Sequence, residues 1–283
     1  MKKSVLSLLI FAGAILSFQA EAQLLKKIQN AAAQGVQNAA NQKANQEANK
    51  AGNEAMEGML GNMMESAPTE SSYSFSGYMV MEIVTTDKKG KTEKPVKMQY
   101  LLSKTPEFMG MAYEDPENST AVTTTIMDSK NSAMVILIDD GKDKSSMAIK
   151  ADYNKIQEEV DKESQEQLSN PNYKLEKTGN KKDILGYSCE EYLVTTEDGE
   201  GRYWVTEKPI DGLSVFSPQS NPMVSNKTME RYSELFSNAP KGSFMEMIFS
   251  DKEGNVTDMK VVELNTNQPR NFSMADYPNL MKQ

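Results

Sequence analysis

The sequence contains no histidine and only one cysteine, Cys189, among its 283 residues. Histidine is the usual general base near neutral pH and a frequent zinc ligand, so its absence removes the Ser/His and Cys/His couples and most zinc sites. A single cysteine cannot form an internal disulfide bond. We therefore expect a protein that is not an enzyme and that needs no metal and no cofactor. A less favoured alternative is an enzyme that relies on carboxylates.

Net positive charge and long apolar runs are also missing. The formal net charge is -9, which repels phosphate backbones, so nucleic acid is not an expected partner. No stretch approaches the roughly 20 apolar residues that a spanning helix needs. We therefore expect no transmembrane span.

The first 22 residues have the organisation of a signal peptide. Lys2 and Lys3 precede an apolar run over residues 5–18, and Ala20 and Ala22 flank Glu21 in an A-x-A cleavage site. Cleavage after Ala22 is expected, and the next residue is glutamine, which offers no thiol for lipid attachment. The sequence thus predicts a soluble periplasmic or secreted protein.

Residues 23–72 are rich in Ala, Gln and Asn and have no aromatic side chain. Two short apolar patches have helical spacing, while the segment between them is polar. We expect a helical arm that ends in a linker over residues 66–72. Residues 24–64 either dock to an envelope protein or to a second copy, or act as a solvated spacer. The patches are Leu24, Leu25 and Ile28, and Met56, Met59, Leu60, Met63 and Met64.

From residue 73 onwards, apolar side chains recur at every second position, which predicts β-strands. A first strand over 73–85 and a return strand over 96–102 are joined by the turn Asp87-Lys88-Lys89-Gly90. Two helical insertions are expected, over about 153–169 and 226–236. We expect residues 73–283 to form a mainly β domain with a curved antiparallel sheet or unclosed barrel. Further strands are predicted at 108–113, 121–127, 133–138, 146–151, 173–178, 187–196, 202–206, 243–250 and 256–265.

The residues that resemble catalytic or metal sites have simpler interpretations. No cationic residue flanks Cys189, so a buried, inert thiol is favoured over a reactive one. Adjacent carboxylates such as Glu190 and Glu191 point to opposite faces of a strand and cannot share a proton. The loop over 251–255 lacks the ligand spacing of a calcium loop, so a hairpin turn is expected.

Methionine is unusually frequent, with 20 residues, many of them on predicted inward faces. Flexible thioether side chains suit either a cavity for an apolar ligand of variable shape or an ordinary core in which methionine replaces leucine. If a cavity exists, the opening hairpin is expected to line it. The candidate ligand-binding residues are Phe75, Met79, Met81, Ile83, Val96, Met98, Tyr100 and Leu102.

Residues 179–192 carry a G-Y-x-C-x-x-Y pattern that is followed by Trp204-Val205-Thr206. This pattern resembles the signature of an uncharacterised family of exported bacterial proteins with a domain of unknown function. That family is similar in expected fold to the LolA/LolB-type lipoprotein carriers, an incomplete barrel that holds acyl chains. The signature residues, for which a structural role is expected, are Gly186, Tyr187, Cys189, Tyr192 and Trp204.

Two functions follow from these observations. The favoured hypothesis is an exported binding protein that carries or senses an apolar ligand, either a lipid or the acyl chain of a lipoprotein. The alternative is a protein–protein interaction or structural module of the cell envelope that docks through its arm. A continuous apolar cavity supports the first hypothesis, whereas a filled core supports the second.

Overall fold

The computed structural model describes residues 65–115, 118–155, 158, 161–162, 172–208, 210, 230 and 242–280. The predicted signal peptide and most of the predicted arm lie outside these residues. Within the two predicted helical insertions, the described residues 153–155, 158, 161–162 and 230 are helical. No helix among the described residues is long and apolar enough to cross a membrane.

Strands make up most of the described chain, as the alternating pattern predicts. The thirteen described strands are followed by a short 3-10 helix, Met274–Asp276. The strands are β1 (Ser72–Phe75), β2 (Gly77–Thr86), β3 (Val96–Leu102), β4 (Phe108–Asp115), β5 (Asn118–Asp128), β6 (Ala133–Asp139), β7 (Lys144–Lys150), β8 (Lys174–Ile184), β9 (Tyr187–Thr195), β10 (Gly199–Thr206), β11 (Ser243–Asp251), β12 (Val256–Asn265) and β13 (Arg270–Ser273).

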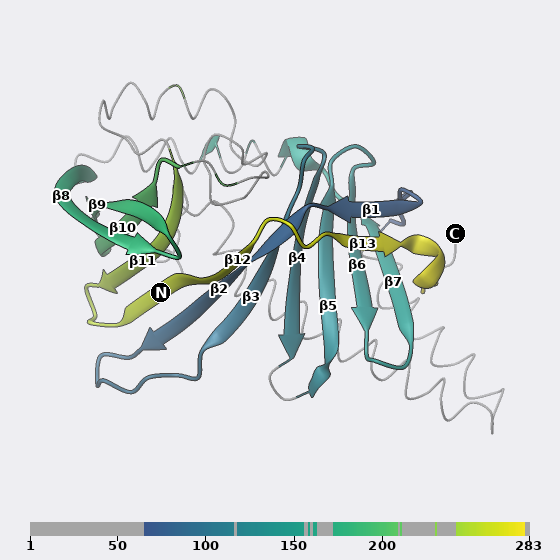
Figure 1. The fold of residues 1–283 in the computed structure, drawn as a ribbon, viewed down its shortest axis with the longest axis horizontal. Helices are drawn as coiled ribbons and strands as arrows, with labels where there is room; N and C mark the ends of the chain where they lie inside the picture. Colours follow the sequence, from purple (N-terminus) through teal and green to yellow (C-terminus); the bar gives the residue numbers. More distant parts are fainter. Residues whose placement is uncertain are drawn as a thin grey trace.

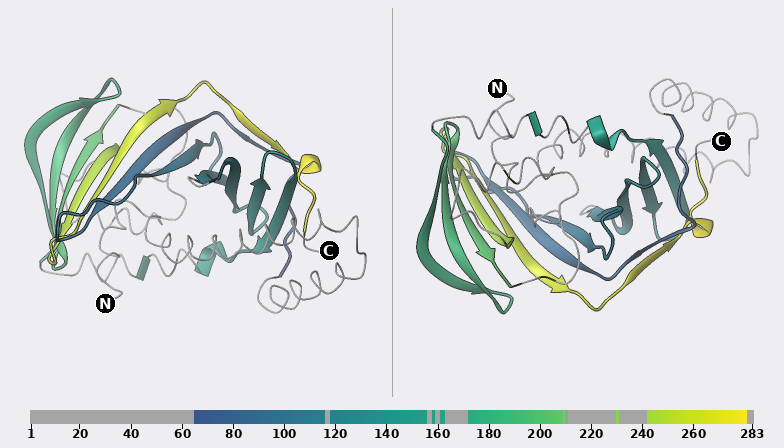
Figure 2. Two further views of the ribbon diagram at one scale, coloured as in Figure 1. Left: turned by 90° about the horizontal axis from the view of Figure 1, so that it is seen from below. Right: turned by 90° about the horizontal axis from the view of Figure 1, so that it is seen from above.

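Eleven of these strands form one antiparallel sheet in the order β7-β6-β5-β4-β3-β2-β12-β11-β10-β9-β8 (Figure 1). It consists of two meanders, β2–β7 and β8–β12, that join where β2 pairs with β12. The two views in Figure 2 show that the sheet is strongly curved. Its end strands β7 and β8 do not pair with each other. The prediction of a curved, unclosed antiparallel sheet is therefore confirmed.

A second, two-stranded sheet pairs β1 with β13 and crosses the first half of the large sheet (Figure 1). The single strand predicted over residues 73–85 is therefore wrong in one respect, because it breaks at Ser76. Phe75 consequently lies on the face opposite to Met79 and packs with Tyr73, Leu101 and other residues beneath the small sheet. Gly110 makes this possible, since a Cβ there would lie 2.8 Å from Cζ of Phe75.

The outer edge of β7 is covered by two segments from opposite ends of the described chain. The amide of Ala67 donates to the carbonyl of Ala148, and the amide of Lys150 donates to the carbonyl of Glu65. Further along the same edge, Ser146 exchanges backbone hydrogen bonds with Pro278 and Leu280. The start of the predicted linker thus pairs with the edge of the large sheet. Covering an edge strand in this way removes unpaired groups that would favour aggregation.

Candidate functional site

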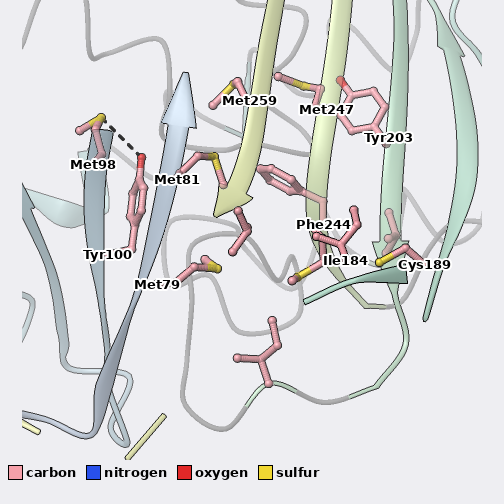
Figure 3. Packing of buried hydrophobic residues seen from close by; sticks show 14 of the residues in the cluster. Met79, Met81, Met98, Tyr100, Ile184, Cys189, Tyr203, Phe244, Met247 and Met259 are labelled. Carbon is pink, nitrogen blue, oxygen red and sulfur yellow. Dashed lines mark hydrogen bonds between the residues drawn. The ribbon is translucent and has the colours of Figure 1, made fainter. Parts of the chain in front are cut away.

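Methionine side chains dominate the largest buried cluster, which we call the methionine-rich cluster. Figure 3 shows Met79, Met81, Met247 and Met259 together, with Phe244 between the strands that carry them. The hydroxyl of Tyr100 lies 3.8 Å from the sulfur of Met98. The methionines of the cluster are Met79, Met81, Met98, Met109, Met111, Met245, Met247 and Met259.

The structure brings together most of the ligand-binding residues predicted on the opening hairpin, but as packed side chains. Met79, Met81, Met98, Tyr100 and Leu102 are buried within the methionine-rich cluster, and Ile83 packs against it. Val96 pairs with Ile83 across the strands and is 41% exposed at the end of the hairpin. Phe75 lies on the opposite face, as described above. Burial of this kind is what the core interpretation of the methionines predicts.

An open cavity lies at a different place, where β12 separates from β11. The two strands pair from Val256 to Lys260 of β12, and beyond Lys260 β12 pairs only with β2 among the described strands. Two β-bulges accompany this separation. One leaves Val262 as an extra residue in β12 opposite β2, and the other leaves Met245 as an extra residue in β11 opposite β10. Bulges bend the strand that carries them, so two bulges on neighbouring strands open the sheet locally.

The cavity has a volume of about 330 Å³. Apolar side chains lie on both sides of it, since Leu185 lies in the β8–β9 turn and Tyr187 begins β9, and Val262 and Leu264 come from β12. Both Tyr187 and Leu264 also pack against the methionine-rich cluster. This volume lies at the lower end of the range for small-ligand sites. Its remaining lining residues are Glu263 and Thr266.

Leu185 forms one wall of the cavity in an unfavourable backbone conformation. Leu185 and Gly186 are the two residues of the β8–β9 turn, with φ values of 53° and 79°. Positive φ at both positions is the geometry of a type I′ hairpin turn, which favours Asn-Gly because an L side chain such as leucine is strained there. Leu185 is nevertheless 48% exposed. An exposed, strained apolar residue beside a cavity is typical of a binding contact.

Charged groups flank the cavity without filling it. Glu263 accepts a hydrogen bond of 2.6 Å from the hydroxyl of Tyr78, on the face that carries β1 and β13. Arg270 stacks over the ring of Tyr78 at 4.7 Å. On the other side, the ammonium of Lys208 lies 4.8 Å from the ring centre of Tyr187. The charges of Glu263 and Lys208 on either side of the cavity are therefore of opposite sign. Glu263 is hydrogen-bonded to Tyr78, and Lys208 lies over the ring of Tyr187.

The signature residues occupy three different environments. Gly186 forms the turn and Tyr187 lines the cavity, whereas Cys189 and Tyr192 are buried in the methionine-rich cluster. Cys189 is buried, as predicted, and burial raises the pKa of its thiol to about 11. Trp204 is half-buried beneath the ammonium of Lys182, 4.1 Å from its ring centre. The sequence pattern pointed to these residues, but gave no sign that the turn borders a cavity.

The carboxylates that might have suggested acid–base chemistry are separated or paired. Glu190 forms ion pairs with Lys177 and Lys181, whereas Glu191 is buried and accepts hydrogen bonds from Thr178 and Asn180. The two adjacent carboxylates therefore have separate partners and share no hydrogen bond, as predicted.

The acidic loop over residues 251–255 is a hairpin turn, as predicted. The amide of Gly254 donates to the carbonyl of Asp251, and the carboxylate of Asp251 accepts from the amide and side chain of Asn255. Within the described parts of the chain, no three His, Cys, Asp or Glu side chains are grouped in a way that could hold a metal ion.

One buried carboxylate lies on a polar face of the sheet, away from the cavity. Glu246 is 5% exposed and pairs with Lys182, and Lys260 lies 3.6 Å from its second oxygen. Asp258 lies on β12 near Glu246. Burial is the main cause that raises the pKa of Asp258, and repulsion from the carboxylate of Glu246 adds to it. Lys182, Glu246 and Lys260 form an ion-pair network across the three strands β8, β11 and β12, and Trp204 of β10 lies beneath the ammonium of Lys182.

Fold and site define an open antiparallel β-sheet protein with a small cavity where two strands separate. The model of one family, described as a domain of unknown function and designated DUF4412, matches residues 75–277. This chain belongs to that family, so the resemblance found in the sequence is confirmed at the level of an uncharacterised domain. No curated protein matches the chain.

The solved structures that match this chain are distant from it. PNGF-II, crystallised in space group C2, is 11% identical with a TM-score of 0.30, and the match covers 67% of this chain but 27% of PNGF-II. A DUF1329 family protein from Desulfovibrio piger is 10% identical, with coverages of 70% and 86% and a TM-score of 0.17. A β-barrel-like DUF1849 protein from Brucella abortus is 8% identical, with coverages of 68% and 98% and a TM-score of 0.19.

Proposed function

We propose that this protein is an exported, non-enzymatic binding protein that takes up an apolar ligand in the cavity between the β8–β9 turn and β12. The observation that carries the proposal is the cavity of about 330 Å³, whose walls include Leu185, Tyr187, Val262 and Leu264. Burying a ligand's apolar surface against such walls contributes roughly 25 cal/mol per Å². The two bulges, at Met245 and Val262, support the proposal. They bend β11 and β12 apart at a place where regular pairing of the two strands would leave no room for a cavity.

The adjacent methionine-rich cluster supports the same function. Methionine side chains change shape at low cost, so a core next to the cavity can adjust to ligands of different length. The signal peptide over residues 1–22 supports export, and N-terminal sequencing of protein from the cell envelope tests it. A mature chain that starts at Gln23 is expected, and any other start contradicts the A-x-A interpretation.

Two exposed residues allow the site to be tested without disturbing the core. Leu185 lines the cavity, whereas Val96 is a comparably exposed apolar residue of the opening hairpin, which the sequence alone pointed to as the ligand site. Leu185→Glu is expected to weaken binding of a fluorescent acyl probe at least about tenfold, because it places a charge against the ligand. Val96→Glu is the matched control and should bind as the natural protein does.

The same titration distinguishes the competing interpretations. If Val96→Glu loses the probe and Leu185→Glu retains it, the ligand binds on the hairpin face and the cavity assignment is wrong. If the natural protein takes up no probe, and native mass spectrometry of protein purified from the envelope finds no bound apolar molecule, the binding function itself is wrong. Thermal melts of both variants should remain close to that of the natural protein, because both positions are exposed.

A further inference from the structure

One wall of the cavity runs along β12 beyond Lys260. Beyond Lys260, β12 is paired with β2 on one side, and no described strand or bridge pairs with its other side. Residues Val262, Leu264 and Thr266 lie in or directly after this stretch and line the cavity. Main-chain N–H and C=O groups along such an edge require hydrogen-bonding partners.

An alkane alone leaves these main-chain groups without partners. A secondary amide matches a strand edge because its N–H can donate to a main-chain carbonyl there, as the amides of a peptide do when it adds to a sheet edge. The cavity beside the edge takes the apolar part of the same molecule.

We propose that the ligand of this cavity carries a secondary amide next to its apolar group, and that the amide pairs with the edge of β12 beyond Lys260, which no described strand covers. This inference rests on the proposed function, since it specifies the ligand class of the same site. The shared chemistry occurs both in N-acylated amines and in extended peptides with a large apolar side chain. The volume of the cavity, about 330 Å³, accommodates one such group rather than a long chain.

A pair of isosteric probes tests the hydrogen bond directly. N-butyloctanamide and butyl octanoate differ in a single N–H that is replaced by oxygen. With the full-length protein, calorimetric titration is expected to give an affinity at least about threefold higher for the amide, because one hydrogen bond of ordinary strength corresponds to roughly a two- to tenfold difference. N-acetyl-leucine N′-methylamide, compared with N-butyloctanamide, shows whether a peptide or an acyl amide fits better.

Hydrogen exchange supplies a second readout, one that a nonspecific apolar contact does not change. When the amide probe binds, main-chain amides of β12 beyond Lys260 that are not bonded to β2 should exchange more slowly. Residues 256–260 serve as the internal control, because β11 already pairs with them. Equal affinity for amide and ester, or unchanged exchange beyond Lys260, overturns the amide inference while leaving apolar binding intact. Failure of every probe to bind overturns the proposed function instead.

Discussion

The hydroxyl of Tyr73 donates a hydrogen bond of 2.7 Å to the carboxylate of Asp128, and both residues are fully buried. This bond joins β1, at the start of the domain, to the end of β5. Asn131 completes the site by donating to Asp128 from its main chain and its side chain. The ring of Tyr73 packs edge-on against Phe108 at 5.3 Å. The contact thus fixes the small β1–β13 sheet over the large one.

Tyr73→Phe is expected to lower the free energy of unfolding by about 1–3 kcal/mol at pH 7, because it removes one of the two donors to a buried carboxylate oxygen of Asp128. Urea denaturation measures the change, and Ser74→Ala, at an exposed position of the same strand, is the control. Equal midpoints for Tyr73→Phe and the natural protein would show that the bond does not stabilise the fold.

The same bond predicts a pH dependence. Burial, followed by the hydrogen bond to Asp128, raises the pKa of Tyr73 above its ordinary value of 10.0. The folded protein therefore holds this proton more tightly than the unfolded chain, so stability falls as the pH rises above 10. Tyr73→Phe should reduce the steepness of that fall between pH 9 and 11. Denaturation curves across this interval compare the two slopes.

Gly110 is expected to tolerate no side chain as long as Phe75 is present. A Cβ at this position would lie 2.7 Å from Leu101 and 2.8 Å from Phe75, so Gly110→Ala should cost about 1–3 kcal/mol. Phe75→Leu removes the far end of the ring. In the double variant the costs should be less than additive by about 1 kcal/mol, which a double-mutant cycle measures. Strict additivity would mean that the two residues do not contact each other.

Replacing Leu185 with asparagine is expected to stabilise the fold. Leucine at φ 53° costs roughly 1 kcal/mol, and Asn-Gly is the preferred pair for this turn, so the unfolding midpoint should rise. Leu185→Ala is the control, because alanine keeps the unfavourable φ without the large side chain. Calorimetric melts give both values. A lower midpoint for Leu185→Asn than for the natural protein would show that the leucine stabilises the turn through its contacts.

Asp258→Asn is expected to raise stability at pH 7. Burial and then Glu246 raise the pKa of Asp258, so the folded state favours its protonated form. A raised carboxyl pKa means that stability is lost as the pH rises above about 4, the ordinary value for this group. The asparagine variant lacks this loss, so its advantage should be present at pH 7 and disappear near pH 3.5.

Asp251 supplies a control of opposite sign. Burial acts to raise the pKa of Asp251, but hydrogen bonds from Asn255 outweigh it and lower that pKa. Asp251→Asn should therefore destabilise the protein at pH 7, and the difference should shrink as the pH falls below 4. Thermal melts at pH 3.5 and 7 of both variants make the comparison. Parallel behaviour of the two variants would contradict the assignment of the two environments.

Alternation of side chains predicted most of the strands of the large sheet from the sequence. It placed the turns at Gly90 and Gly254 and the curved, open architecture correctly. The break at Ser76 was not predictable in the same way, since Tyr73, Phe75 and Met79 keep a period of two across it. The pairing of β1 with β13 and the packing of Phe75 against Gly110, both far away in the sequence, show that β1 leaves the large sheet.

The candidate site was harder to predict for a related reason. A bulge adds one residue to a strand without changing its composition, so nothing at Val262 or Met245 marks the opening of the sheet. The face of the opening hairpin that looked suitable for a ligand is rich in methionine because it is part of the methionine-rich cluster. A signal was present at Leu185, an apolar residue directly before a turn glycine, where asparagine is the common choice.

The covered edge of β7 determines how the domain can be tethered. Glu65 lies at the outer edge of β7, which Pro278 and Leu280 also cover, and β7 is one end strand of the large sheet. The turn that borders the cavity joins β8 and β9, at the other end of that sheet. A surface or partner that binds the chain before Glu65 would therefore attach to the domain at the end of the sheet opposite to the cavity. The length of that segment would then set how far the cavity can reach, without changing what the cavity binds.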